Sequence, residues 1–110
     1  MSDMLEYNGY IGNVMYSSAD EVFHGKLLGI SDHITYEGNS IQALKQDFTE
    51  AVEDYLQGCR ELNKTPETPV QGRFTIRISP ELHKKLLALS STRKQPFNTV
   101  VEEALRRYVG

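Results

Sequence analysis

The sequence predicts an α+β protein built from two small modules, and three observations lead to this prediction. Residues 73–78 alternate strictly between polar and apolar side chains, which is typical of a half-buried strand. Other stretches repeat apolar residues at three- and four-residue steps, which predicts amphipathic helices. The charge also changes sign along the chain. Residues 1–63 hold three Lys/Arg against eleven Asp/Glu, whereas residues 64–110 hold nine Lys/Arg against four Asp/Glu. This asymmetry indicates two modules with different partners.

The first module, residues 1–63, is predicted to contain three strands followed by one helix. Aromatic and β-branched residues favour a strand region within 4–16, a second strand from Val22 to Ile30 and a short third strand from His33 to Tyr36. Ser40 is a suitable N-cap for the helix that follows. The expected buried stripe of that helix comprises Ile41, Leu44, Phe48, Ala51, Val52, Tyr55 and Cys59.

Residues 64–71 are polar and contain two prolines, so we expect an extended, semi-stiff linker. Few backbone groups in such a segment have a partner, which predicts that it is the protease-sensitive point of the chain.

The second module, residues 72–110, is predicted to run strand, helix, helix. The first helix begins at Ser79-Pro80-Glu81, which combines an N-cap, a proline at the first helical position and an acid in the first turn. That helix is expected to end near Ser91, with a buried stripe at Leu82, Leu86, Leu87 and Leu89, and the next helix to start about Phe97. The buried face of this last helix is expected to hold Val100, Val101, Ala104, Leu105 and Tyr108. A module this small rarely folds alone.

The predicted strand 73–78 lacks a partner within the chain, because no second strand of this pattern follows it. Its backbone groups need one, and the nearest candidate is the same strand of another copy. Two antiparallel copies would form a ribbon with Arg73, Thr75 and Arg77 outward, and the DNA major groove admits such a ribbon. On the strand alone, an ordinary solvated sheet face remains the alternative. The expected dimer core comprises Phe74, Ile76, Ile78, Leu82, Leu86, Val101 and Leu105.

The composition indicates where the protein is located and whether it holds a disulfide, a metal or a cofactor. The chain has no 18-residue apolar run and no secretion signal, and its single Cys59 permits no internal disulfide. These features predict a cytoplasmic protein without a membrane span. His24, His33 and His83 lie far apart without ligand spacing, so we expect neither a metal site nor a cofactor.

Two stretches resemble known families. Residues 72–110 are similar to the ribbon-helix-helix modules, which read DNA with a strand pair. Residues 7–57 resemble the HicB antitoxin domain. The matching residues are Tyr10-Ile11-Gly12, Val22-Phe23-His24-Gly25, Ile34-Thr35-Tyr36-Glu37-Gly38, Leu44-Lys45-Gln46-Asp47-Phe48 and Ala51-Val52.

These resemblances imply an antitoxin of a type II toxin–antitoxin system. The first module would have a partly degraded RNase H-like fold that binds and blocks a HicA-like toxin, an mRNA-cleaving ribonuclease. The second module would form a homodimer or a higher homo-oligomer and repress its own operon. In that class Arg73, Thr75 and Arg77 contact bases of the operator DNA. The start of the last helix clamps a phosphate, here at Asn98 and Thr99, although Pro96 stands where relatives often carry serine.

Two alternatives stay open. A stand-alone repressor would use its first module to sense a ligand or to oligomerise, and a short basic reading frame beside the gene would argue against it. An active nuclease of the RNase H type would need carboxylates that converge on metal ions, one of them from the middle of the first strand. Residues 10–16 contain no Asp or Glu, so we expect that the protein is not an enzyme.

Overall fold

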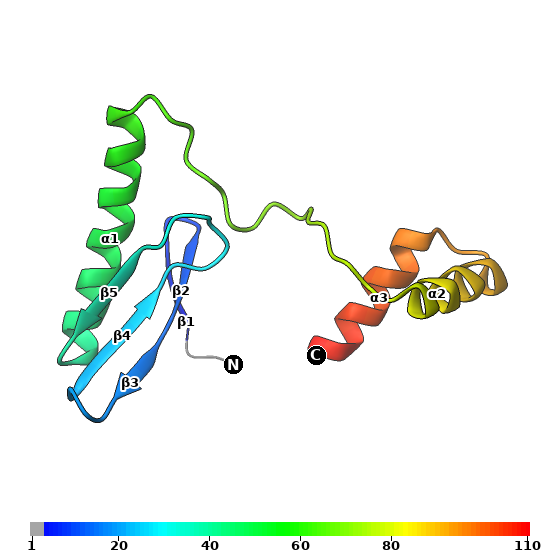
Figure 1. Cartoon of the computed structure of the whole chain (residues 1–110), viewed down its shortest axis with the longest axis horizontal. Coiled ribbons are helices and arrows are strands. Elements are labelled where there is room, and N and C mark those ends of the chain that lie inside the picture. Colours follow the sequence, from blue (N-terminus) through cyan, green and yellow to red (C-terminus); the bar gives the residue numbers. More distant parts are fainter. Residues whose placement is uncertain (1–3) are drawn as a thin grey trace. The chain divides into compact units, whose positions relative to one another are not determined.

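The computed structural model describes residues 4–110, and contacts divide the chain into a first unit that ends at Arg73 and a second unit, Phe74–Gly110. Within the described residues the fold is mixed α+β, with five strands in two small sheets and three helices (Figure 1). The predicted α+β class is therefore confirmed. No helix within residues 4–110 is both long and apolar enough to cross a membrane.

The first unit contains all five strands. The sheets are antiparallel, in the orders β1-β2 and β3-β4-β5, and an isolated bridge between Gly12 and Leu27 connects them. The strands are β1 (Met4–Tyr7), β2 (Tyr10–Asn13), β3 (Met15–Ser17), β4 (Val22–Lys26) and β5 (Thr35–Gly38).

The prediction of three strands in this unit was wrong. The region 4–16 is not one strand, because Asn8 and Gly9 adopt positive φ angles of 54° and 84° and fold it into the β1-β2 hairpin. An Asn-Gly pair is the usual signal for such a two-residue turn. The second strand also ends at Lys26 rather than Ile30, and the third is shifted by two residues.

Helix α1 (Ile41–Glu61) packs along β5 and provides most of the core of the first unit (Figure 1). The Ser40 side chain accepts a hydrogen bond from the Ala43 N–H at 3.1 Å, which confirms the predicted N-cap. The predicted stripe is buried except at Ile41, which is 48% exposed, and at the half-buried Ala51. The buried core comprises Tyr10, Leu27, Tyr36, Leu44, Phe48, Val52, Tyr55 and Cys59.

Tyr36 is the centre of this core. Its ring lies edge-on to that of Phe48, with centroids 5.1 Å apart, and its hydroxyl donates to the Asn13 carbonyl at 2.7 Å. A Cβ at Gly12 would collide with the Tyr36 hydroxyl, so the sheet can approach the ring only with glycine there. Burial raises the pKa of Tyr36 to about 12, which keeps the hydroxyl protonated as a structural donor.

The predicted linker, residues 64–71, lies within the first unit and has no regular secondary structure. Few of its backbone groups were expected to have partners, but both backbone groups of Glu67 have one. The Glu67 N–H donates to the Tyr55 hydroxyl at 3.0 Å, and the Glu67 carbonyl accepts from the Tyr10 hydroxyl at 2.7 Å. Two core tyrosines therefore hold this part of the segment.

The second unit contains α2 (Pro80–Arg93) and α3 (Phe97–Val109). The Ser79 side chain caps α2 by accepting from the Leu82 N–H at 3.2 Å, as predicted, and the helix runs two residues beyond the predicted end. Within the described residues, the segment 73–78 pairs with no strand. The strand predicted at residues 73–78 would form only where two chains pair, so it stays a prediction.

Candidate functional site

The second unit carries an apolar groove of about 560 Å³. It lies between the segment that precedes α2 and the facing sides of the two helices. Six of the seven residues predicted as dimer core line it, and only Phe74, which is 72% exposed, does not. The lining residues are Ile76, Arg77, Ile78, Leu82, His83, Leu86, Phe97, Val101, Ala104 and Leu105.

These groove residues remain largely uncovered in one chain. Of residues 74–110, all of which the structure describes, only Val100 is a buried hydrophobic residue. Ile76, Leu82 and Leu105 are 56%, 46% and 45% exposed. The expected buried stripe of α2 is therefore not buried within one chain, because the unit contains too few elements to cover it. On α3 the expected face is buried at Val100 but exposed at Tyr108.

Two groove residues were missed by the sequence analysis. His83 and Phe97 face each other across α2 and α3, with ring centroids 5.6 Å apart. Phe97 directly follows Pro96 and marked the start of a helix, so its apolar ring was not assigned to the core. The signal that could have found it is its spacing of four from Val101, one helical turn away.

The residues predicted to contact bases are exposed. None of the ion pairs found within residues 4–110 involves Arg73 or Arg77, so both guanidinium groups are free of internal partners there. Arg77 also lines the groove beside Ile76 and Ile78. Its aliphatic stem can cover apolar surface while its charged end stays in water.

The residues predicted to contact phosphate lie at the start of α3, where Asn98 and Thr99 are exposed. The N-cap is Pro96, and no side chain caps this helix end. The first helical bond runs from the Val100 N–H to the Pro96 carbonyl at 3.2 Å. The preceding amides therefore point outward at the positive end of the helix dipole, which favours an anion.

The first unit carries a polar cleft of about 510 Å³ on its three-stranded sheet. His24, Glu37 and Asp47 contribute to it, together with Asp20. The Asp47 carboxylate accepts a hydrogen bond from the Glu37 N–H at 2.8 Å and so satisfies an edge donor of β5. Within the described residues, no group of three or more His, Cys, Asp or Glu side chains is arranged to hold a metal ion.

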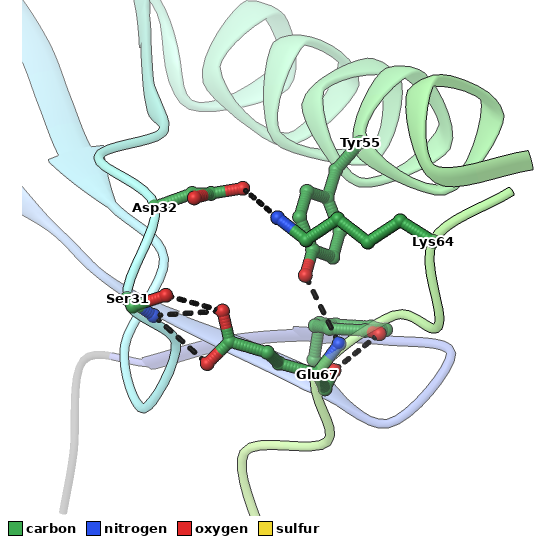
Figure 2. Close-up of polar contacts among 6 residues, drawn as sticks. Ser31, Asp32, Tyr55, Lys64 and Glu67 are labelled. Atoms are coloured by element: carbon green, nitrogen blue, oxygen red, sulfur yellow. Dashed lines mark hydrogen bonds and ion pairs between the residues drawn. The ribbon is translucent and has the colours of Figure 1, made fainter. Parts of the chain in front are cut away.

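Residues 64–69, which we call the strap, lie against the loop 29–32 (Figure 2). The Glu67 carboxylate accepts hydrogen bonds from the Ser31 N–H, at 3.1 and 3.2 Å to its two oxygens, and from the Ser31 hydroxyl. These bonds lower the pKa of Glu67, and the charge of Lys64 adds to the effect. Lys64 is 3.6 Å from the Asp32 carboxylate.

Comparison with known proteins gives one match. The family model described as HicB family matches residues 55–105, which cover the end of α1, the strap, the segment 73–78 and most of the second unit. The match thus lies mostly beyond residues 7–57, where the sequence resemblance to this family was found. Neither the curated proteins nor the solved structures contain a match. The match covers slightly less than half of the chain and supports its membership of the HicB family.

Proposed function

We propose that this protein is the antitoxin of a type II toxin–antitoxin system, with one task for each unit. Membership of the HicB family suggests a protein associated with such a system. The first unit would neutralise a HicA-like mRNA-cleaving toxin. The second unit would form a dimer and repress the operon by placing a two-stranded ribbon in the DNA major groove. The observation that supports dimer formation and DNA binding by the second unit is its uncovered apolar groove.

A second copy would complete the second unit. The groove and the unpaired segment 73–78 lie together, so one pairing event would cover Ile76 and Leu82 and satisfy the backbone of the segment. This is the arrangement of a ribbon-helix-helix dimer, in which each chain is half of one core. The groove is strongly apolar, whereas a site for DNA itself would be polar and basic.

Pairing would also concentrate the DNA-binding groups. Each chain contributes Arg73, Thr75 and Arg77 to the ribbon, and arginine can make two hydrogen bonds to one guanine. The uncapped start of α3 would hold a backbone phosphate near Asn98 and Thr99 and so fix the register of the ribbon. Residues 74–110 hold seven Lys/Arg against three Asp/Glu, which favours a polyanion.

The first unit suits a basic protein partner. It carries eleven Asp/Glu against three Lys/Arg in residues 1–63, and Glu50, Glu53 and Asp54 are exposed on α1. Such a surface speeds the encounter with a cationic ribonuclease and repels nucleic acid. A partly degraded RNase H-like fold would serve here as a binding scaffold.

The test uses the full chain and its genomic neighbour. We expect co-purification with a small basic protein encoded next to the gene, and rescue of cells that the toxin arrests. We also expect retarded migration of promoter DNA that depends on Arg73 and Arg77. Absence of such a partner, together with no rescue, would contradict the antitoxin assignment.

A stand-alone repressor is the second candidate, and the polar cleft around His24 and Glu37 is the observation that favours it. In this case the first unit would sense a small polar ligand. Screening of metabolites by thermal shift, with Glu37→Gln as the control variant, separates the two functions. A ligand that stabilises the wild type alone and changes promoter binding would favour the sensor.

A further inference from the structure

One residue of the apolar groove can change its charge near neutral pH. His83 lines the groove from α2, and its ring centroid lies 5.6 Å from that of Phe97 at the start of α3. In a single chain the His83 side chain is exposed, so water can solvate it when it is protonated. Histidine side chains gain a proton at about pH 6.5, so a modest change in pH changes the charge of this groove.

The groove offers a protonated His83 no carboxylate. Its neighbours on α2 are Leu82 and Leu86, and α3 presents only apolar side chains to the groove. The segment that precedes α2 contributes Arg77, which is a second cation. The lining therefore holds two groups that can be positive and none that can be negative.

The carboxylates of the second unit are engaged elsewhere. Residues 74–110, all of which the structure describes, contain Glu81, Glu102 and Glu103, and none of the three lines the groove. Each forms an ion pair with a Lys or Arg side chain of the same unit, at 2.7 to 3.7 Å between nitrogen and oxygen. A second copy that pairs through the same groove brings the same lining, so pairing adds no carboxylate from this surface.

Covering the groove would therefore penalise the protonated form of His83. Pairing removes water from the lining, and a charged group without an opposite charge costs far more to bury than a neutral one. The neutral imidazole avoids this cost and keeps its ring contact with Phe97. Since the paired state then holds fewer protons than the separate chains, association weakens as the pH falls through the range in which histidine titrates.

We propose that His83 makes pairing of the second unit depend on pH, because its neutral form permits closure of the groove and its protonated form opposes closure. This inference rests on the proposed function, since it concerns the dimer through which the second unit would bind DNA. Acidification would separate the chains and release the operon from repression.

The size of the effect follows from the number of histidines that must lose a proton. If only the neutral form pairs, each chain loses affinity about elevenfold at pH 5.5 but only about 1.1-fold at pH 7.5. Two chains contribute to one dimer, so the dissociation constant should rise at most about a hundredfold between these two conditions. Partial solvation of His83 in the dimer reduces this limit, and we expect a rise of about tenfold or more.

Sedimentation velocity of the full-length chain at about pH 7.5 and pH 5.5 measures this rise, because most carboxylates titrate below this range. The variant His83→Gln keeps a polar side chain of similar size that gains no proton, and its dissociation constant should change less than about threefold. The matched control, His24→Gln/His33→Gln, removes the other two histidines of the chain, both of which lie in the first unit. This control should retain the full effect of the wild type.

A second measurement needs no substitution at His83. The ring resonances of His83 are titrated in the wild type at a concentration that favours the pair, and in Leu82→Ala at a concentration that keeps the chains separate. The midpoint should be lower in the pair by about 0.5 or more on the pH scale. Equal midpoints, or equal pH effects in the wild type and His83→Gln, would overturn the inference and leave the proposed function intact. Absence of a wild-type dimer at either pH would instead contradict the proposed function, and the inference with it.

Discussion

The apolar groove of the second unit leads to a sharp test of pairing, the substitution Leu82→Ala. Leu82 lies on α2, lines the groove and is 46% exposed in one chain. Full burial of a leucine is worth about 1.5–3 kcal/mol. Covering the remaining exposed part on pairing should therefore contribute about 1 kcal/mol per chain, or about 2 kcal/mol for the pair. Because 1.4 kcal/mol is a factor of ten, we expect the dimer dissociation constant to rise about thirtyfold.

The same helix supplies the matched control, Leu87→Ala. Leu87 is 51% exposed and does not line the groove, so its truncation should change the dissociation constant by less than about twofold. Sedimentation velocity over a range of protein concentrations measures both constants, and circular dichroism checks that the helix content is unchanged. If Leu87→Ala weakened association as much as Leu82→Ala, or if neither did, the groove would not be the pairing surface.

Four further outcomes are expected. Arg73→Ala and Arg77→Ala should each lose about 1–3 kcal/mol of base discrimination per contact in promoter gel shifts, because both side chains are exposed. Arg73 does not line the groove, so Arg73→Ala should also leave thermal melting unchanged, and a lowered melting temperature of that variant would refute its outward assignment. The pKa of Tyr36 is raised from 10.0 to about 12, so stability should fall as the pH rises through this range, and Tyr36→Phe should reduce that loss in alkaline melts. The pKa of Glu67 is lowered from 4.5, so the contact between its carboxylate and Ser31 should persist above pH 4.5 and weaken only as the pH falls below that value, which the amide resonance of Ser31 will report. The pure protein should show no metal-dependent RNA cleavage, and cleavage that survives repurification would support the nuclease alternative.

The helices could be predicted from the sequence, because they depend on patterns among neighbouring residues. Ser40 and Ser79 cap α1 and α2 as predicted, because an N-cap depends on one side chain and the amides three residues later. The apolar stripe of α1 is buried from Leu44 to Cys59, except at the half-buried Ala51, because a three- and four-residue period places its members on one face. The Asn8-Gly9 turn is equally local. The Asn-Gly pair in the sequence was sufficient to predict two strands in the region 4–16 instead of one.

The strap is a different case, because nothing in residues 64–71 indicates which distant groups they touch. A polar segment with two prolines looks like a free linker. Its attachment depends on hydroxyl groups of Tyr10 and Tyr55 and on Ser31, which come together only when β2, α1 and the loop 29–32 have packed.

The sequence by itself determined the α+β class, the helix starts and the opposite charges of the two halves, because composition and short-range spacing are sufficient for these features. Only the tertiary structure decided which apolar residues are covered. Leu44 and Leu82 belong to equally regular helical patterns, yet the first is fully buried and the second is 46% exposed. Periodicity shows which side chains share a face, but burial depends on whether another element packs against that face, and the second unit has too few elements to do so.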